Sequence, residues 1–237
     1  MEGRISPRDA RDRMIVALDV DSLAAARQLV AALGASVNFY KIGMQLVLAG
    51  GLPLVGELLA AGKRVFLDAK LLDIDNTVAG AVTSIAQLNV TLTTIHAYPK
   101  AMRAAVGANS EGGPGLLAVT ALTSMDDADL LAAGYGASAA ALVQARAADA
   151  RAAGMDGVVC SPQEIAAVRA TIGPDMLIVT PGVRPAGSPA GDQRRMTTPA
   201  EAIAVGADYL VVGRPVTAAP DPRGAADAVV AEVEAAS

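Results

Sequence analysis

Short apolar runs alternate with longer segments of helical character along the whole chain. Eight runs have the length and composition of buried strands: Met14–Asp19, Val37–Ile42, Arg64–Lys70, Thr91–His96, Gly115–Ala121, Gly157–Cys160, Met176–Thr180 and Tyr209–Gly213. Helices fit between them, for example Ser22–Leu33, Asn76–Leu88, Ala137–Ala153, Pro162–Ile172 and Thr198–Val205, with a last one over roughly Gly224–Ala235. Ser22, Ser161 and Thr198 suit helix starts, and Gly34, Gly62, Gly154 and Gly206 stand where helices end.

Strands that alternate with crossover helices give either a closed barrel or a doubly wound open sheet. A dinucleotide-binding open sheet has a glycine fingerprint after its first strand, but here that strand ends in Asp19-Val20-Asp21. We therefore predict a (β/α)8 TIM barrel of the α/β class. The 237 residues approach the ~250 of a standard barrel, so a single domain over residues 1–237 is expected.

Composition narrows the classes of function. Hydrophobic residues make up 53% of the chain and charged residues 18%, which allows a large core. The formal net charge is −5 and no basic block is present, which argues against nucleic-acid binding. A bound anion would therefore need a few well-placed cations, and the only lysines are Lys41, Lys63, Lys70 and Lys100.

The cysteine count and the N-terminal stretch point to one compartment. Cys160 is the only cysteine, which excludes an intramolecular disulfide and favours a reducing environment. Met1–Arg13 is charged and lacks the apolar segment of a signal peptide. No run of ~20 mainly apolar residues is found, so we expect a cytoplasmic protein without a membrane partner.

Polar residues collect where the predicted strands end. In chain order the ends give Asp19, Lys41, Asp68 with Lys70, His96, Thr123 just beyond the fifth strand, Cys160, Thr180-Pro181-Gly182 and Gly213-Arg214. The chemistry of such barrels is performed at this end. Alternation along a strand places Asp68 and Lys70 on one face, so both should point into the barrel mouth. Half-buried charges must be paired, which a mouth with carboxylates and ammonium groups achieves.

A phosphate site is indicated on the other side of the mouth. The loops after strands seven and eight bind phosphate in many barrels, and Gly213-Arg214 offers backbone N–H groups with a guanidinium. Arg184 and Gln193 lie in the long irregular stretch Arg184–Thr197, which is typical of an active-site lid.

The remaining reactive side chains favour plainer interpretations. His96 is more simply a hydrogen-bonded rim histidine, and Cys160 an apolar filler. Asp68, Asp73 and Asp75 could surround Mg2+, but Lys70 would compete for the same carboxylates. No metal and no cofactor is therefore predicted.

The run from Asp68 to Val78 resembles a known signature. It reads Asp-Ala-Lys-Leu-Leu-Asp-Ile-Asp-Asn-Thr-Val and is similar to the Asp-x-Lys-x-x-Asp-Ile-x-Asn-Thr motif of orotidine 5′-monophosphate (OMP) decarboxylases. Further matches follow in the order of that family: Leu18-Asp19, Lys41-Ile42-Gly43, Leu122-Thr123-Ser124-Met125, Pro181-Gly182-Val183-Arg184-Pro185, Asp192-Gln193-Arg194-Arg195 and Val212-Gly213-Arg214-Pro215-Val216.

This resemblance implies a cofactor-free decarboxylation of OMP to UMP, the last step of de novo pyrimidine biosynthesis. The family's pattern places Asp68 near the substrate carboxylate and Lys70 beside the carbon that loses CO2. Two like charges ~4 Å apart repel by ~4 kcal/mol at an effective dielectric of ~20, and loss of CO2 relieves that repulsion. Lys70 would stabilise the developing carbanion and protonate it as general acid.

The other roles are implied by the same resemblance. Lys41 and Asp73 would extend the charge network, and Asp73 and Thr77 would reach the neighbouring subunit's site in a homodimer. The substrate contacts implied are Asp19 and Lys41 to the ribose, Thr123 to the pyrimidine, and Arg184, Gln193, Gly213 and Arg214 to the phosphate end.

Three departures from the family's pattern and two rival functions accompany the resemblance. The family usually has Pro where Asp75 stands and a ring where Leu72 stands, and small residues where Tyr98-Pro99-Lys100 follow His96. One rival is the metal-dependent group of 3-keto-L-gulonate 6-phosphate decarboxylase and hexulose-phosphate synthase, which has a carboxylate where Lys41 stands. The other is a catalytically silent barrel that only binds a phosphorylated metabolite.

Overall fold

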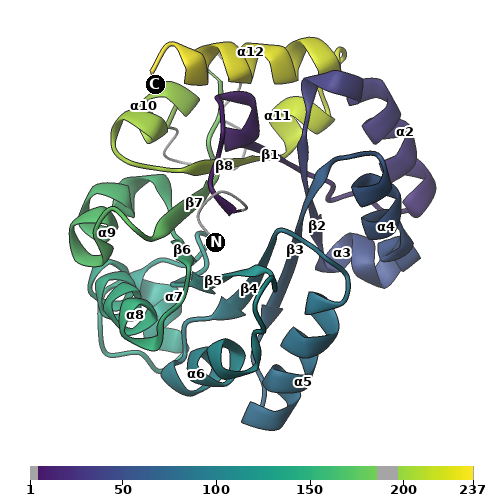
Figure 1. Ribbon diagram of the computed structural model, residues 1–237. Helices are drawn as coiled ribbons and strands as arrows, with labels where there is room; N and C mark the ends of the chain where they lie inside the picture. Colours follow the sequence, from purple (N-terminus) through teal and green to yellow (C-terminus); the bar gives the residue numbers. More distant parts are fainter. Residues whose placement is uncertain (1–4, 186–196, 237) are drawn as a thin grey trace.

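The computed structural model describes residues 5–185 and 197–236. Eight parallel strands close into a barrel in sequence order, and helices surround it (Figure 1). The strands are β1 (Met14–Ala17), β2 (Phe39–Gly43), β3 (Arg64–Leu71), β4 (Leu92–His96), β5 (Gly115–Val119), β6 (Gly157–Val159), β7 (Leu177–Pro181) and β8 (Tyr209–Val212). The predicted barrel is confirmed, although several strands end one or two residues earlier than the sequence indicates.

The outer ring consists of helices of very different length. The main helices are α2 (Leu23–Leu33), α4 (Pro53–Ala60), α5 (Asp75–Ala86), α6 (Pro99–Ala108), α8 (Ala139–Ala153), α9 (Ile165–Ile172), α10 (Pro199–Ala204) and α12 (Pro222–Glu234). Shorter turns are η1 (Arg11–Arg13), η2 (Gly34–Ser36), α3 (Met44–Leu46), η3 (Val47–Gly51), α7 (Asp127–Ala132), η4 (Pro162–Glu164) and α11 (Arg214–Thr217). None of the described helices is long and apolar enough to cross a membrane.

The predicted helix caps have a structural basis. The Ser22 hydroxyl accepts a hydrogen bond from the backbone N–H of Ala25 at 3.2 Å. Ser161 and Thr198 each form a capping box with the glutamate three residues later, and a proline follows each of them. Gly154 ends α8 with a φ of 80°, a left-handed conformation that favours glycine.

Most of the strand residues are buried, and they fall into two apolar layers. Inside the barrel lie Ile15, Ala17, Phe39, Phe66, Leu92, Leu117, Leu177, Val179, Tyr209 and Val211. The larger second layer lies between strands and helices and includes Val16, Tyr40, Val65, Leu210 and Val212. Strands that are covered on both faces read as nearly continuous apolar runs, which is the pattern that identifies them in the sequence.

Strand β3 is longer than its neighbours and contains a bulge. Leu67 pairs with Thr93 and Leu71 pairs with Ile95, so four positions along β3 span only two along β4. Within the bulge Lys70 has a φ of 46°, a left-handed conformation that is unusual for a lysine. Its backbone N–H donates to the Thr94 hydroxyl at 2.9 Å, which fixes the bulge on β4.

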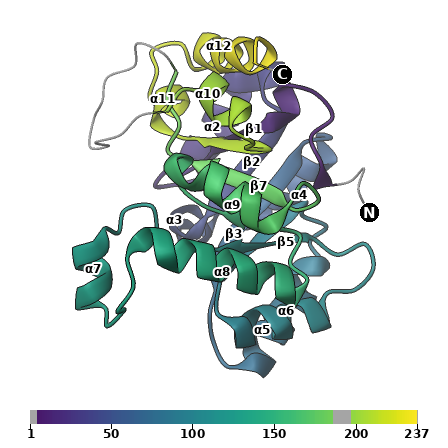
Figure 2. The same cartoon turned by 90° about the vertical axis from the view of Figure 1, so that its left-hand side faces the viewer.

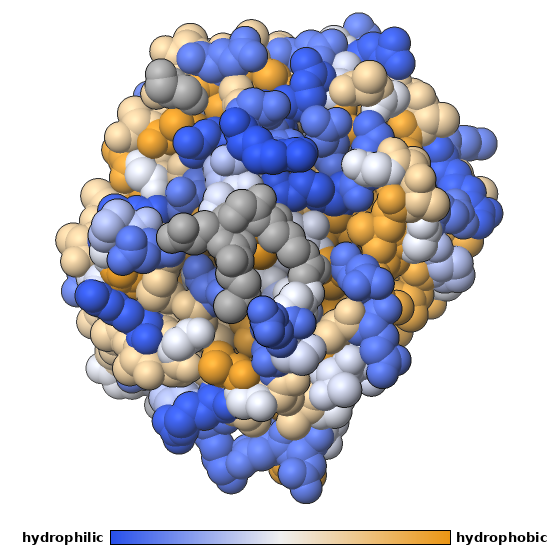
Figure 3. Space-filling view, in the orientation of Figure 1, coloured by the Kyte–Doolittle hydropathy of each residue, from blue (hydrophilic) through white to orange (hydrophobic). Residues whose placement is uncertain are grey.

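The N-terminal end of the barrel is closed by the first described residues. The carbonyl of Ile5 accepts hydrogen bonds from the Tyr209 hydroxyl at 2.5 Å and from the Arg64 guanidinium at 3.3 Å. The guanidinium of Arg64 lies 4.4 Å from the centroid of the Phe39 ring. Figure 2 places this start of the chain (purple) at one end of the barrel and α7 at the opposite end. Figure 3 shows the molecule from the N-terminal end of the barrel, with one group of hydrophilic side chains just above the centre of the view and others around its edges.

Candidate active site

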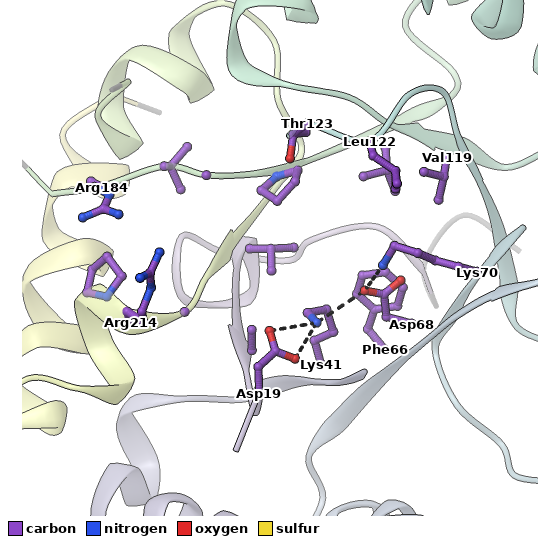
Figure 4. A pocket seen from close by; sticks show the side chains of 18 of the residues that line it. Asp19, Lys41, Phe66, Asp68, Lys70, Val119, Leu122, Thr123, Arg184 and Arg214 are labelled. Carbon is purple, nitrogen blue, oxygen red and sulfur yellow. Dashed lines mark hydrogen bonds and ion pairs between the residues drawn. The ribbon is translucent and has the colours of Figure 1, made fainter. Parts of the chain in front are cut away.

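A cavity of about 290 Å³ opens at the carboxyl ends of the strands. Its apolar lining includes Ala17, Phe66 and Val211 of the inner layer, together with Val119 and Val159. Its wall includes, among the residues predicted from the sequence, Asp19, Lys41, Asp68, Lys70, Thr123, Arg184, Gly213 and Arg214 (Figure 4). The volume approaches the roughly 300–1,000 Å³ of typical small-molecule sites.

A row of alternating charges occupies one side of the cavity. The Lys41 ammonium lies 3.0 Å from Asp19 and 3.3 Å from Asp68. The Lys70 ammonium lies 2.6 Å from the same oxygen of Asp68. β2 and β3 position Lys41 and Asp68, while Asp19 follows β1 after two residues. The row therefore reads carboxylate, ammonium, carboxylate, ammonium, as Figure 4 shows.

Asp68 is the most enclosed carboxylate of this row. Its residue is 7% exposed, and its second oxygen accepts a hydrogen bond from the Thr94 hydroxyl at 2.8 Å. Burial alone would raise the pKa of Asp68, but the charges of Lys41 and Lys70, with the Lys70 and Thr94 hydrogen bonds, outweigh it and lower the pKa. Asp68 is therefore a carboxylate at neutral pH, surrounded by donors.

Thr94 was not predicted from the sequence, yet it connects the two central charges. Its hydroxyl donates to Asp68 and accepts from the backbone N–H of Lys70. The signal available was alternation: Leu92, Thr94 and His96 share one face of β4, and Leu92 belongs to the inner layer. What could not be predicted was the bulge in β3 that brings the Lys70 backbone to this hydroxyl.

Two arginines lie at the opposite end of the cavity. Arg184 follows β7 and Arg214 begins α11 after β8, and Figure 4 shows both at the left of the view, away from Lys70. The Arg184 backbone N–H donates to the carbonyl of Thr197 at 3.1 Å. Thr123 lies on a third side of the cavity, in the loop after β5.

Two predicted site residues, Asp73 and Thr77, do not line this cavity. Asp73 and Thr77 are exposed, and the Asp73 carboxylate accepts a hydrogen bond from the N–H of Ile74 at 2.6 Å. Gln193 lies outside the described residues. Asp75, at the start of α5, forms an ion pair with Lys100 of α6 at 3.3 Å.

His96 and Cys160 lie at the ends of β4 and β6 without joining the charged row. Burial, then the charges of Lys70 and Arg146, lower the pKa of His96, so its imidazole is neutral at pH 7. Burial raises the pKa of the Cys160 thiol to about 12, which leaves an unreactive thiol. Among the described residues, no group of three or more His, Cys, Asp or Glu side chains could hold a metal ion.

Comparison with known proteins agrees with this geometry. The family model described as "Orotidine 5'-phosphate decarboxylase / HUMPS family" matches residues 12–229. The chain belongs to this family. The resemblance drawn from the Asp68–Val78 motif is thereby confirmed.

Individual members of the orotidine 5′-phosphate decarboxylase / HUMPS family match nearly the whole chain. Orotidine 5'-phosphate decarboxylase from Rhodopseudomonas palustris (strain BisB5) is 59% identical over 227 residues, which cover 96% of this chain and 97% of the relative. The enzyme of the same name from Afipia carboxidovorans is 57% identical over 231 residues, or 98% of each chain. The crystal structure of orotidine 5'-phosphate decarboxylase from Lactobacillus acidophilus superposes with a TM-score of 0.81 at 37% identity, covering 93% of this chain and 98% of that one.

Proposed function

We propose that this chain catalyses the decarboxylation of OMP to UMP, the last step of de novo pyrimidine biosynthesis, without a metal or organic cofactor. The observation that carries the proposal is the row Asp19–Lys41–Asp68–Lys70, which faces a cavity that has arginines at its far end. A substrate with a phosphate at one end and a carboxylate at the other matches this distribution of charge.

The Arg184 and Arg214 end suits the phosphate. A guanidinium fork binds phosphate oxygens bidentately, and the N–H groups around Gly213 add further donors. With the phosphate held there, the ribose hydroxyls would lie beside Asp19 and Lys41, and the pyrimidine would lie between Thr123 and the central pair. Binding energy gained at the remote phosphate can then fix the reacting carbon against Lys70.

Asp68 and Lys70 would perform the chemistry. The lowered pKa keeps Asp68 ionised, so a substrate carboxylate placed beside it is repelled by ~4 kcal/mol at ~4 Å and an effective dielectric of ~20. The bond between C6 and the carboxyl carbon breaks, CO2 leaves, and the electron pair stays on C6. Lys70 then transfers an Nζ proton to C6 and regains a proton from water.

Lys41 favours this reaction over that of the metal-dependent sugar-phosphate enzymes of the same family. Its ammonium contacts both Asp19 and Asp68, at 3.0 and 3.3 Å. A divalent cation at this place would need further oxygen ligands, and instead it would meet a positive charge. The donor set therefore suits a metal-independent reaction.

We further propose that two copies associate through the face that carries Asp73 and Thr77. Large apolar side chains are exposed close to these residues in the sequence, with Leu72 49% exposed and Ile74 71% exposed. A second copy would cover them and could bring Asp73 and Thr77 to the neighbouring cavity. Sedimentation should give twice the chain mass of 23.8 kDa, and Ile74→Lys should shift the protein towards that single-chain mass.

The single cysteine, Cys160, is a buried free thiol, which suits a protein that acts in the cytoplasm.

Ultraviolet monitoring of OMP in the presence of EDTA tests the reaction. We expect loss of substrate absorbance with UMP as the only nucleotide product, at the same rate with and without EDTA. Absence of conversion by folded protein would overturn the proposal, as would activity that requires Mg2+ and a keto sugar phosphate. Binding of UMP without turnover would favour the silent barrel instead.

A further inference from the structure

A cluster of two tyrosines and an arginine lies beside the cavity at the carboxyl end of the barrel. Tyr98 immediately precedes α6, Tyr135 lies between α7 and α8, and Arg146 belongs to α8. Figure 2 shows α7 and α8 on the same side of the barrel, connected by the segment that contains Tyr135.

The guanidinium of Arg146 is held on several sides. Its carbon lies 4.8 Å from the Tyr98 ring centroid and 5.2 Å from that of Tyr135. One nitrogen donates to the Tyr135 hydroxyl at 2.9 Å, and the hydroxyls of the two tyrosines are hydrogen-bonded to each other. The other nitrogen donates to the backbone carbonyl of Thr120 at 2.6 Å. The face and the two terminal nitrogens of the guanidinium are therefore held by different segments of the chain.

Thr120 connects this cluster to the cavity wall. Its N–H and its hydroxyl both donate to the Val159 carbonyl, at 3.2 and 2.8 Å, so it is anchored to β6 as well. The next three residues, 121–123, all line the cavity. Leu122 and Thr123 are themselves exposed, so the buried Thr120 is the fixed point from which this wall extends.

We propose that Arg146, held between Tyr98 and Tyr135, is a positioning residue that sets the cavity wall at residues 121–123 against the base of the nucleotide. This inference rests on the proposed function, since it assumes that Thr123 faces the pyrimidine. None of the three side chains lines the cavity, so they act through the Thr120 carbonyl. Loss of the hydrogen bond from Arg146 to the Thr120 carbonyl should loosen the side of the cavity that meets the base. The end of the cavity at Arg184 and Arg214 should be unchanged.

Two probes separate these two ends of the cavity. UMP carries a base and a phosphate, whereas ribose 5-phosphate carries only the phosphate and the sugar. In Arg146→Met we expect the affinity for UMP to fall about 10- to 100-fold, which is the size of effect expected when a polar contact to a ligand is left unmade. The affinity for ribose 5-phosphate should equal that of the wild type. Calorimetry measures both, and kcat/KM for OMP should fall in parallel with the UMP affinity.

Matched variants guard against a general structural effect. Arg151 lies on the same helix and donates to the Thr171 carbonyl at 3.2 Å, so Arg151→Met should keep both affinities. Arg146→Lys keeps the positive charge but loses the planar guanidinium with its two terminal donor nitrogens. It should therefore lower the UMP affinity by less than Arg146→Met does. Should Arg146→Met fail to fold, Tyr135→Phe removes one hydroxyl and should still weaken UMP selectively.

Each outcome is decisive. Selective loss of UMP affinity in the Arg146 and Tyr135 variants would support the positioning role of Arg146. Equal loss of both ligands, or unchanged binding of UMP, would overturn it while leaving the proposed decarboxylase intact. A wild-type protein that binds ribose 5-phosphate but not UMP would instead overturn the proposed function itself.

Discussion

Strand β3 has an inward-facing charge at each end, and the two charges lie in opposite surroundings. Arg64, Phe66 and Asp68 alternate along its inner face, with the apolar Phe66 between the two charged residues. At the N-terminal end Arg64 lies 3.6 Å from Asp12, which is fully buried. At the carboxyl end Asp68 lies 2.6 Å from Lys70.

The electrostatics of the two carboxylates are alike. Burial would raise the pKa of Asp12, but the hydrogen bond from Arg8 and the charge of Arg64 outweigh it and lower the pKa. Asp68 behaves in the same way with its two lysines. Both are carboxylates that the fold keeps ionised although they are taken out of water.

The two ends of the barrel differ in whether the charged pair is covered by other residues. Ile5, Asp12 and the rings of Phe39 and Tyr209 surround the Arg64 guanidinium, which donates to the Ile5 carbonyl and the Tyr209 hydroxyl. The Asp68 end faces a cavity of about 290 Å³. A covered ion pair can contribute only to the fold, whereas a pair beside a cavity can also act on a ligand. We therefore expect substitutions at the two ends to change different quantities.

Lys70→Ala should give the largest effect, and on turnover alone. Without the general acid, kcat for OMP should fall by about 10²- to 10⁴-fold. The melting temperature should stay near that of the wild type, because Asp68 keeps Lys41 at 3.3 Å and the Thr94 hydroxyl. Lys63→Ala is the control, since Lys63 donates to the Gly34 and Val37 carbonyls and does not line the cavity. A Lys70→Ala variant with wild-type kcat would refute the assignment of the acid.

Arg64→Met should lower the free energy of unfolding by about 3–5 kcal/mol, because it breaks a buried pair and leaves Asp12 with Arg8 alone. Urea denaturation measures the change. Arg11→Met is the matched control: Arg11 pairs with Asp227 at 3.7 Å on the surface, and such pairs contribute about 0–1 kcal/mol. Equal effects of the two variants would mean that the covering adds nothing.

Thr94→Val should affect both quantities moderately. It removes the hydroxyl that donates to Asp68 and accepts from the Lys70 backbone, at an expected cost of about 1–3 kcal/mol in stability. It should also lower kcat, since Lys70 loses its fixed backbone position. Thr93→Val on the same strand removes a hydrogen bond to the Leu67 carbonyl on the other face, so it should lower stability without changing kcat. A loss of kcat in both variants would contradict this division.

The smallest effect concerns His96, the only histidine of the chain. Its pKa is lowered by burial and then by the positive charges of Lys70 and Arg146. Removal of a positive charge favours the protonated imidazole, so Lys70→Ala should raise the pKa of His96. Arg64→Met, at the far end of the barrel, should leave it unchanged. The single imidazole signal in a proton NMR titration reports both values, and a downward shift in Lys70→Ala would contradict the geometry.

The carboxyl end of the barrel was largely predictable from the sequence. Strand runs buried on both faces identify the barrel, and in a barrel every strand end faces the same mouth. Asp19, Lys41, Asp68 and Lys70 could therefore be grouped without knowing the helices. The caps at Ser22 and Thr198 were equally accessible, because they depend on contacts within four residues.

The features that were missed depend on contacts distant in sequence. The partnership of Arg64 with Ile5 and Asp12 links a strand to a turn more than fifty residues earlier, and no local pattern reports it. The bulge around Lys70 needs the register of β4. Helices α4 and α6 are a different case: neither was named from the sequence, although the proline at which each begins is a local signal of a helix start.

The most direct test compares the decarboxylation rates of Arg64→Met and Lys70→Ala at a temperature at which circular dichroism finds both folded. With EDTA present, we expect Arg64→Met to keep the wild-type kcat/KM for OMP while Lys70→Ala loses almost all of it. Equal losses in the two variants, or a loss confined to Arg64→Met, would contradict the assignment of chemistry to the open end of the barrel and stability to the covered one.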